Sequence, residues 1–156
     1  MSGLMLLVEA LHGMAATIWI GGIFFAFMAL RPAANVSLEP AERIKLWQSA
    51  YYYFFPWVWV MIAVLLATGY TDLFVRFDGF DNGAIYLGMM HAIGLMMILL
   101  FAYLYFVLYR RLSLAVSAND TPTASGEMAR MRPVMAINLT LGLLITAIGI
   151  AGPGVF

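Results

Sequence analysis

The sequence contains no cysteine and very few charged residues. Of its 156 residues, 10% are charged and 64% are hydrophobic, whereas soluble domains carry about 25% charged residues. The absence of cysteine excludes disulfides, thiolate metal sites and thiol nucleophiles. The formal net charge is zero and no basic face is present, so no nucleic acid partner is expected. The composition indicates a protein whose surroundings are membrane lipid.

Recognisable catalytic motifs are also missing. The sequence shows no catalytic triad pattern, no Walker loop, no zincin histidine pair and no Rossmann glycine pattern. Any chemistry would then be carried out by a bound cofactor. The N-terminus lacks a cationic stretch ahead of its first apolar run, so we expect this run to stay in the membrane as an uncleaved span.

Four apolar segments are long enough to cross a bilayer as helices, for which about 20 residues suffice. They cover about residues 4–30, 51–73, 84–109 and 133–151. Residues 110–131 contain the stretch SANDTPTASGE and are predicted to form the longest loop. Because only closed backbone hydrogen bonding is stable in lipid, the sequence predicts an all-α, integral membrane, four-helix up-down bundle that forms a single transmembrane domain.

The cations are distributed unevenly among the predicted loops. Only Arg76 falls in the second loop, and the other seven cations fall in the first and third. These seven are Arg31, Arg43, Lys45, Arg110, Arg111, Arg130 and Arg132. Since an excess of Lys and Arg marks the cytoplasmic side, we expect a multi-pass protein of the bacterial inner membrane with both termini outside the cytoplasm.

The only two histidines occupy equivalent positions in the first and third spans. His12 precedes Arg31 by 19 residues, and His91 precedes Arg110 by the same number. This spacing corresponds to about 28 Å of helix, close to the hydrocarbon thickness of a membrane. The two imidazoles are therefore predicted at one depth, roughly 10–12 Å below the outer surface. Ionisable residues inside a membrane are costly and usually functional.

Small residues share the helix faces of both histidines. Ala16 lies one turn after His12, and Gly88 and Gly94 flank His91. These positions leave room for a flat group between two helices. Ligation by two imidazoles is typical of a low-spin b-type haem suited to electron transfer. We therefore predict that His12 and His91 are the iron ligands of haem b. Quinone or a periplasmic protein is the candidate redox partner, and a homodimer is a candidate assembly.

Two other interpretations of the histidines stay open. Each imidazole could simply hydrogen-bond a neighbouring carbonyl and serve helix packing. Copper is the rival ligand, because thioethers suit Cu(I) and the chain has 12 methionines. Most methionines close in sequence to a histidine fall on other helix faces, as do Met14, Met89, Met90, Met96 and Met97. Copper at this pair is therefore the second choice.

Further polar candidates lie near the same membrane side. Arg76 could pair with haem propionates, or it could be a solvated loop charge. Glu9 could bond the second nitrogen of an imidazole, or it could be an ordinary interfacial carboxylate. Trp19 is expected to pack, and Asn138 is expected to join helices.

Several segments resemble one family. They are LHGMAATIWIGGIFFAFMALRP, LW before the aromatic second span, TGY at the end of that span, and FAYLYFVLYRRL. They resemble the CopD-like superfamily of small bacterial membrane proteins, over most of the chain. The resemblance implies copper resistance for some branches and b-type haem for others, among them the HemJ-type protoporphyrinogen oxidase. That enzyme has a histidine–lysine neighbourhood in its third span, whereas Ile93 and Gly94 follow His91 here. The resemblance supports His12 and His91 as the site and leaves haem, copper and enzyme activity open.

Overall fold

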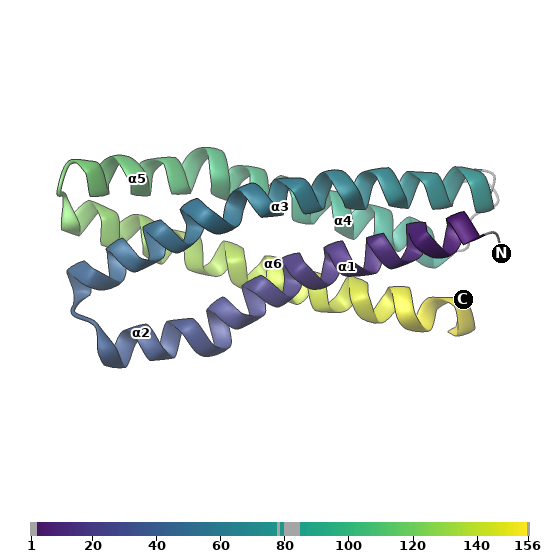
Figure 1. The fold of residues 1–156 in the computed structure, drawn as a ribbon. Coiled ribbons are helices and arrows are strands. Elements are labelled where there is room, and N and C mark those ends of the chain that lie inside the picture. The colour runs from purple at the N-terminus through teal and green to yellow at the C-terminus, as the bar shows by residue number, and fades with distance from the viewer. Residues whose placement is uncertain (1–2, 78, 80–84, 156) are drawn as a thin grey trace.

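Residues 3–77, 79 and 85–155 are described by the computed structural model, and they form long helical rods (Figure 1). The first rod consists of α1 (Gly3–Phe25), the π-helical segment η1 (Ala26–Leu30) and α2 (Arg31–Ser37). The second is α3 (Pro40–Arg76). The third consists of α4 (Ile85–Tyr103), the π-helical segment η2 (Leu104–Tyr109) and α5 (Arg110–Ser117), and the fourth is α6 (Thr121–Val155). The described residues contain no strand, which confirms the all-α prediction.

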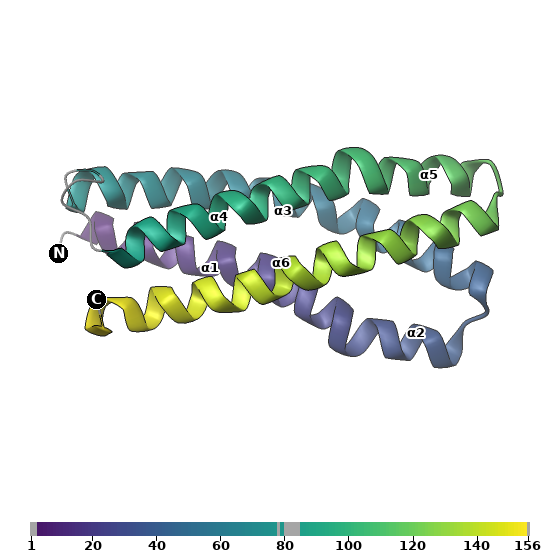
Figure 2. The same cartoon turned by 180° about the vertical axis from the view of Figure 1, so that it is seen from behind.

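The rods run alternately in opposite directions along a common axis. Within the described part of the chain, four of them are long and apolar enough to cross a membrane. Both ends of the chain lie at one end of the bundle, and the α2–α3 and α5–α6 turns lie at the other (Figures 1 and 2). The predicted up-down bundle is confirmed. Residues 78 and 80–84, which include part of the predicted second loop, lie outside the described residues.

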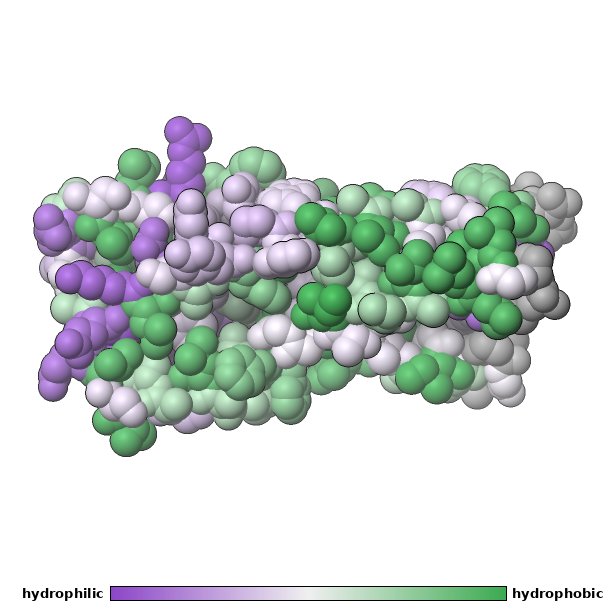
Figure 3. Space-filling model, viewed as in Figure 1, coloured by the Kyte–Doolittle hydropathy of each residue, from purple (hydrophilic) through white to green (hydrophobic). Residues whose placement is uncertain are grey.

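Hydrophilic side chains gather at the end that carries α2 and α5, as Figure 3 shows for one face of the molecule. The seven cations of the predicted first and third loops belong to α2, the first turns of α3, α5 and the first half of α6. Arg76 ends α3 at the opposite end of the bundle. The structure thus gathers the seven cations at one end, as the loop assignment required.

The predicted long loop over residues 110–131 is wrong. α5 continues to Ser117 and α6 begins at Thr121, so only a tight turn joins them. Asn119 has φ 56°, a left-handed conformation that commonly ends a helix. The Asp120 carboxylate then accepts hydrogen bonds from the backbone N–H of Thr123 at 3.0 Å and from its hydroxyl at 2.6 Å. These bonds favour the ionised carboxylate and lower the pKa of Asp120.

The aromatic run of α3 divides between the interior and the outside. Phe55 is only 2% exposed and stacks on Tyr51 with ring centroids 4.9 Å apart. Its ring also makes edge contacts with Phe101 of α4 at 5.3 Å and with Tyr109 of η2 at 5.1 Å. Tyr52, Tyr53 and Trp57 point outward instead. Part of the run therefore belongs to the core of the bundle, and part faces its surroundings.

Glycine allows close packing between α1 and α3. A Cβ built at Gly22 would overlap the ring of Phe54, whereas a Cβ at the neighbouring Gly21 would meet nothing within 4 Å. The two glycines of the sequence WIGG therefore differ in their surroundings. Only the second is required for the approach of the two helices.

We expect Gly22→Ala to destabilise the bundle by about 1–3 kcal/mol, because the added methyl group must displace an aromatic ring in a packed interface. The matched variant Gly21→Ala should be neutral or slightly stabilising, since alanine is the better helix former. Thermal unfolding of the detergent-purified variants measures the difference. Equal unfolding temperatures for the two variants would contradict the packing assigned to Gly22.

Candidate histidine site

His12 lies on α1 with its imidazole against α3. Its Nδ1 is 2.8 Å from the hydroxyl oxygen of Thr68. The Thr68 hydroxyl is itself 2.6 Å from the carbonyl oxygen of Val64, to which it donates its proton. Because the only hydroxyl proton is used in this hydrogen bond, the hydroxyl oxygen accepts the hydrogen bond from Nδ1–H of His12. Nε2 of His12 is then the nitrogen with the free lone pair, which is the protonation state that a metal requires.

Gly69 makes room for this imidazole. A Cβ built at Gly69 would lie 3.3 Å from Cε1 of His12. That distance is tighter than ordinary van der Waals contact, so a larger residue at position 69 would push the ring away from Thr68. Sequence reasoning noted the segment TGY only as part of a resemblance and assigned no role to Thr68 or Gly69.

The third residue of TGY contacts the other histidine. The ring of Tyr70 meets the His91 imidazole edge to face, with centroids 5.6 Å apart and an interplanar angle of 70°. Thr68 and Tyr70 are two residues apart, which is about 3 Å along a helix axis. His12 and His91 therefore contact the same turn of α3, in agreement with the predicted common depth.

The two histidines belong to different helix pairs. α1 packs mainly against α3, and α4 packs mainly against α6, along most of their lengths. Both imidazoles are partly buried. A group bound by both would connect the two pairs at the end of the bundle where the chain termini lie (Figure 1).

The small residues predicted near the histidines have different surroundings. A Cβ at Gly88 would meet nothing within 4 Å, so this position offers open space. Gly94 instead faces α6, where its Cβ would lie 3.7 Å from Cδ1 of Ile145. Ala16 packs against the buried core. Gly88 is an exposed residue of α4, so its open space lies at the surface of the bundle.

Glu9 and Arg76 form an ion pair. The Arg76 guanidinium donates a hydrogen bond to the Glu9 carboxylate, and its Nη1 lies 3.6 Å from the Asp72 carboxylate. The suggestion that Glu9 could hold the second nitrogen of an imidazole is therefore wrong for His12, since Thr68 has that place. The Arg76–Glu9 pair joins the ends of α3 and α1 beside the histidine site.

Trp19 and Asn138 behave as packing residues, as expected. Trp19 is 3% exposed and makes an edge contact with Phe101 at 6.0 Å. The side-chain amide of Asn138 donates a hydrogen bond to the Met97 carbonyl at 3.3 Å, which joins α6 to α4. Among the described residues there is no group of three or more His, Cys, Asp or Glu side chains that could hold a metal ion. A metal at this site would depend on the two imidazoles.

Comparison with known proteins identifies the family. The family model described as copper resistance protein D matches residues 48–152, which is more than half of the chain. The matched segment contains α4 with His91 and the TGY residues of α3, and it begins after His12. No curated protein and no solved structure matches the chain. The chain is a membrane protein that belongs to the copper resistance protein D family.

Proposed function

We propose that His12 and His91 would hold a haem b, which would supply electron transfer near the end of the bundle where the termini lie. One observation supports this best. The hydrogen bond to Thr68 leaves Nε2 of His12 as the basic nitrogen, and His91 contacts the same turn of α3 from the other helix pair. Bis-histidine haem binding requires two imidazoles from the protein, and these two lie at one level on separate helices.

The two imidazoles fit the ligand requirement of haem b. Haem supplies four nitrogens of its own and needs only two from the protein, and the described residues offer no third histidine or carboxylate cluster beside the pair. When bound, haem b supplies one-electron redox chemistry. The chain's own residues hold and orient the group. Thr68 fixes the tautomer of His12, and Gly69 admits its ring.

Direct copper binding by the same two imidazoles is the second candidate. The specific observation in its favour is the match to the copper resistance protein D family. Imidazole binds copper well, and Cu(I) accepts few ligands when they are soft or neutral. A HemJ-like oxidase receives no such support, because the chain's one lysine, Lys45, lies on α3 at the far end of the bundle.

The absorption spectrum of the purified protein tests the two candidates. Protein from haem-replete cells is expected to be red and, after reduction with dithionite, to show the sharp α and Soret bands of a low-spin b-type haem. Metal analysis should find iron near one equivalent and copper near zero. A colourless protein that retains copper through detergent would reverse the order of the two candidates.

We propose further that the histidine end of the bundle faces the periplasm, where the group could exchange electrons with quinone or a periplasmic protein. The concentration of seven cations at the other end supports this orientation. Alkaline phosphatase fused after Phe156 should be active, and green fluorescent protein at the same position should be dark. The opposite pattern would place the histidines on the cytoplasmic side.

A further inference from the structure

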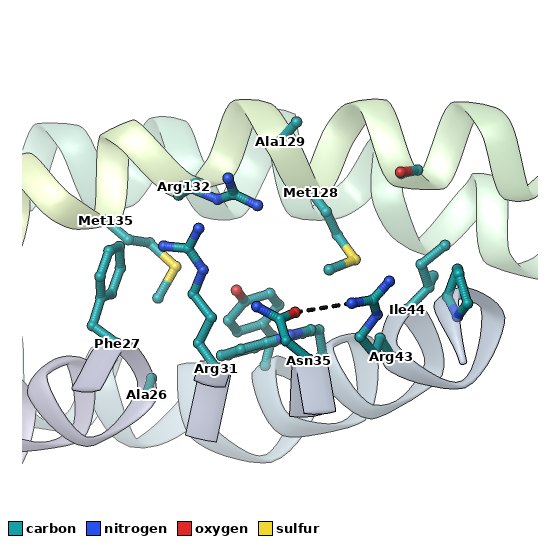
Figure 4. A pocket seen from close by; sticks show the side chains of 14 residues that line it. Ala26, Phe27, Arg31, Asn35, Arg43, Ile44, Met128, Ala129, Arg132 and Met135 are labelled. Atoms are coloured by element: carbon teal, nitrogen blue, oxygen red, sulfur yellow. Dashed lines mark hydrogen bonds between the residues drawn. The ribbon is translucent and has the colours of Figure 1, made fainter. Parts of the chain in front are cut away.

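A pocket of about 210 Å³ lies at the end of the bundle opposite the histidines. It is bounded by η1 and α2 on one side, by the first turns of α3, and by α6 on the other side (Figure 4). Arg31 of α2, Arg43 of α3 and Arg132 of α6 all line it. Three helices therefore each contribute one guanidinium to the same space, and α6 is distant in sequence from the other two.

The arginines are held by neutral partners. Nη1 of Arg43 donates a hydrogen bond to the side-chain carbonyl of Asn35 at 3.1 Å. The guanidinium of Arg31 lies over the Phe27 ring, 5.7 Å from its centroid. Arg31 and Arg132 extend toward each other from facing walls (Figure 4). No aspartate or glutamate lines the pocket.

The described carboxylates at this end of the bundle are engaged elsewhere. Glu39 and Glu42 form the capping box at the start of α3, and Asp120 caps α6. Glu127 pairs with Arg130 at 2.9 Å. In the described part of the chain, none of the three pocket arginines has a carboxylate within ion-pair distance. The pocket thus has three positive charges with no acidic counterpart.

Like charges in a partly enclosed, low-dielectric space repel each other, and a bound anion would turn this repulsion into attraction. Guanidinium groups bind phosphate oxygens with paired hydrogen bonds, and arginine is the residue best suited to this geometry. The rest of the lining is mostly apolar, with Trp47, Ile44 and Met128, and it includes the polar side chains of Asn35, Tyr51 and Ser125. The pocket therefore combines a phosphate-sized cationic centre with walls that suit an acyl or glycerol group.

We propose that Arg31, Arg43 and Arg132 form a binding site for a phosphate-bearing anion, independent of the histidine site. The phosphate belongs either to the headgroup of an anionic membrane lipid or to a soluble organic phosphate. Basic pockets between transmembrane helices commonly bind lipid headgroups on the cytoplasmic side. The bound phosphate joins α2, α3 and α6, which approach one another through this pocket.

The experiment compares two double variants that remove equal charge from the same end of the bundle. Arg31→Gln/Arg132→Gln removes two pocket arginines. Arg110→Gln/Arg111→Gln removes two exposed arginines of α5 that do not line the pocket. Arg132 is exposed and makes no ion pair among the described residues, so the single variant Arg132→Gln is expected to fold. It replaces the pocket double variant in the comparison if that variant fails to fold.

The first arm measures lipid binding by native mass spectrometry after exchange into mixed micelles of phosphatidylglycerol and phosphatidylcholine. The wild type and the α5 variant should retain phosphatidylglycerol preferentially, and the pocket variants should lose this preference by about tenfold or more, because charge-assisted bonds are lost. The second arm titrates inorganic phosphate and glycerol 3-phosphate at constant ionic strength and records the unfolding temperature.

Loss of lipid preference only in the pocket variants identifies the anion as a headgroup. Stabilisation by the soluble phosphates in the wild type and the α5 variant, but not in the pocket variants, identifies a soluble ligand and equally supports the site. If the pocket and α5 variants behave alike with both probes, binding reflects the overall charge of this end and the proposed site is wrong.

Discussion

Replacing His12 or His91 with alanine is expected to abolish the low-spin haem spectrum of the purified protein. A haem held by the two histidines would need a neutral imidazole nitrogen from each, and alanine supplies none. Each single variant should therefore contain no haem or a weakly held high-spin haem, and the double variant should contain none. All three variants should still insert and elute as folded bundles, because both imidazoles are only partly buried.

Two methionine variants provide the control. Met14→Ala and Met89→Ala change exposed residues of α1 and α4, close in sequence to the two histidines. Both should keep the wild-type spectrum if haem is bound by imidazoles. If the protein instead binds Cu(I) through the imidazoles, copper content should fall in the histidine variants and stay unchanged in the methionine variants, while no variant shows a haem band.

The histidine experiment also separates ligation from packing. If the imidazoles only form hydrogen bonds, each alanine variant should lose about 1 kcal/mol of stability and leave any haem spectrum unchanged. A wild-type spectrum in the double variant would therefore overturn the assignment of the site, whatever else the protein binds.

The bundle and the histidine pair could be predicted from sequence because both depend on spacing within a single helix. Four apolar runs of sufficient length predict four spans, and equal spacing of His12 and His91 from a terminal arginine predicts a common depth. The turn between α5 and α6 could not be predicted in the same way. Its composition is typical of a flexible loop, and the turn depends on the conformation of Asn119 and the cap formed by Asp120.

Contacts between helices that are separated in the sequence could not be predicted from it. Thr68 lies 56 residues from His12, and nothing in the spacing of either helix indicates that they meet. The same holds for Arg31, Arg43 and Arg132, which were counted only as cytoplasmic charges. Each of these pairings depends on how neighbouring rods are rotated about their axes, and the hydropathy of nearly uniform apolar helices carries little information on that rotation.

Thr68→Val is expected to weaken cofactor binding by about 10–100-fold, which is typical for loss of the group that orients a metal-binding histidine. Valine has nearly the same shape as threonine but cannot accept the proton of Nδ1. The His12 ring then loses its fixed tautomer and carries an unsatisfied N–H in an apolar environment.

Thr68→Ser is the matched control, since it retains the hydroxyl that bonds both His12 and the Val64 carbonyl. Titration of haem into the apoprotein, followed at the Soret band, gives the affinity, and a redox titration gives the midpoint potential of the bound group. Serine should restore the affinity and potential to near the wild-type values, whereas valine should change both. If Thr68 merely packs, valine should be the milder substitution because it preserves the buried volume. Wild-type affinity in the valine variant, with reduced affinity in the serine variant, would show that the Thr68 hydroxyl does not orient His12.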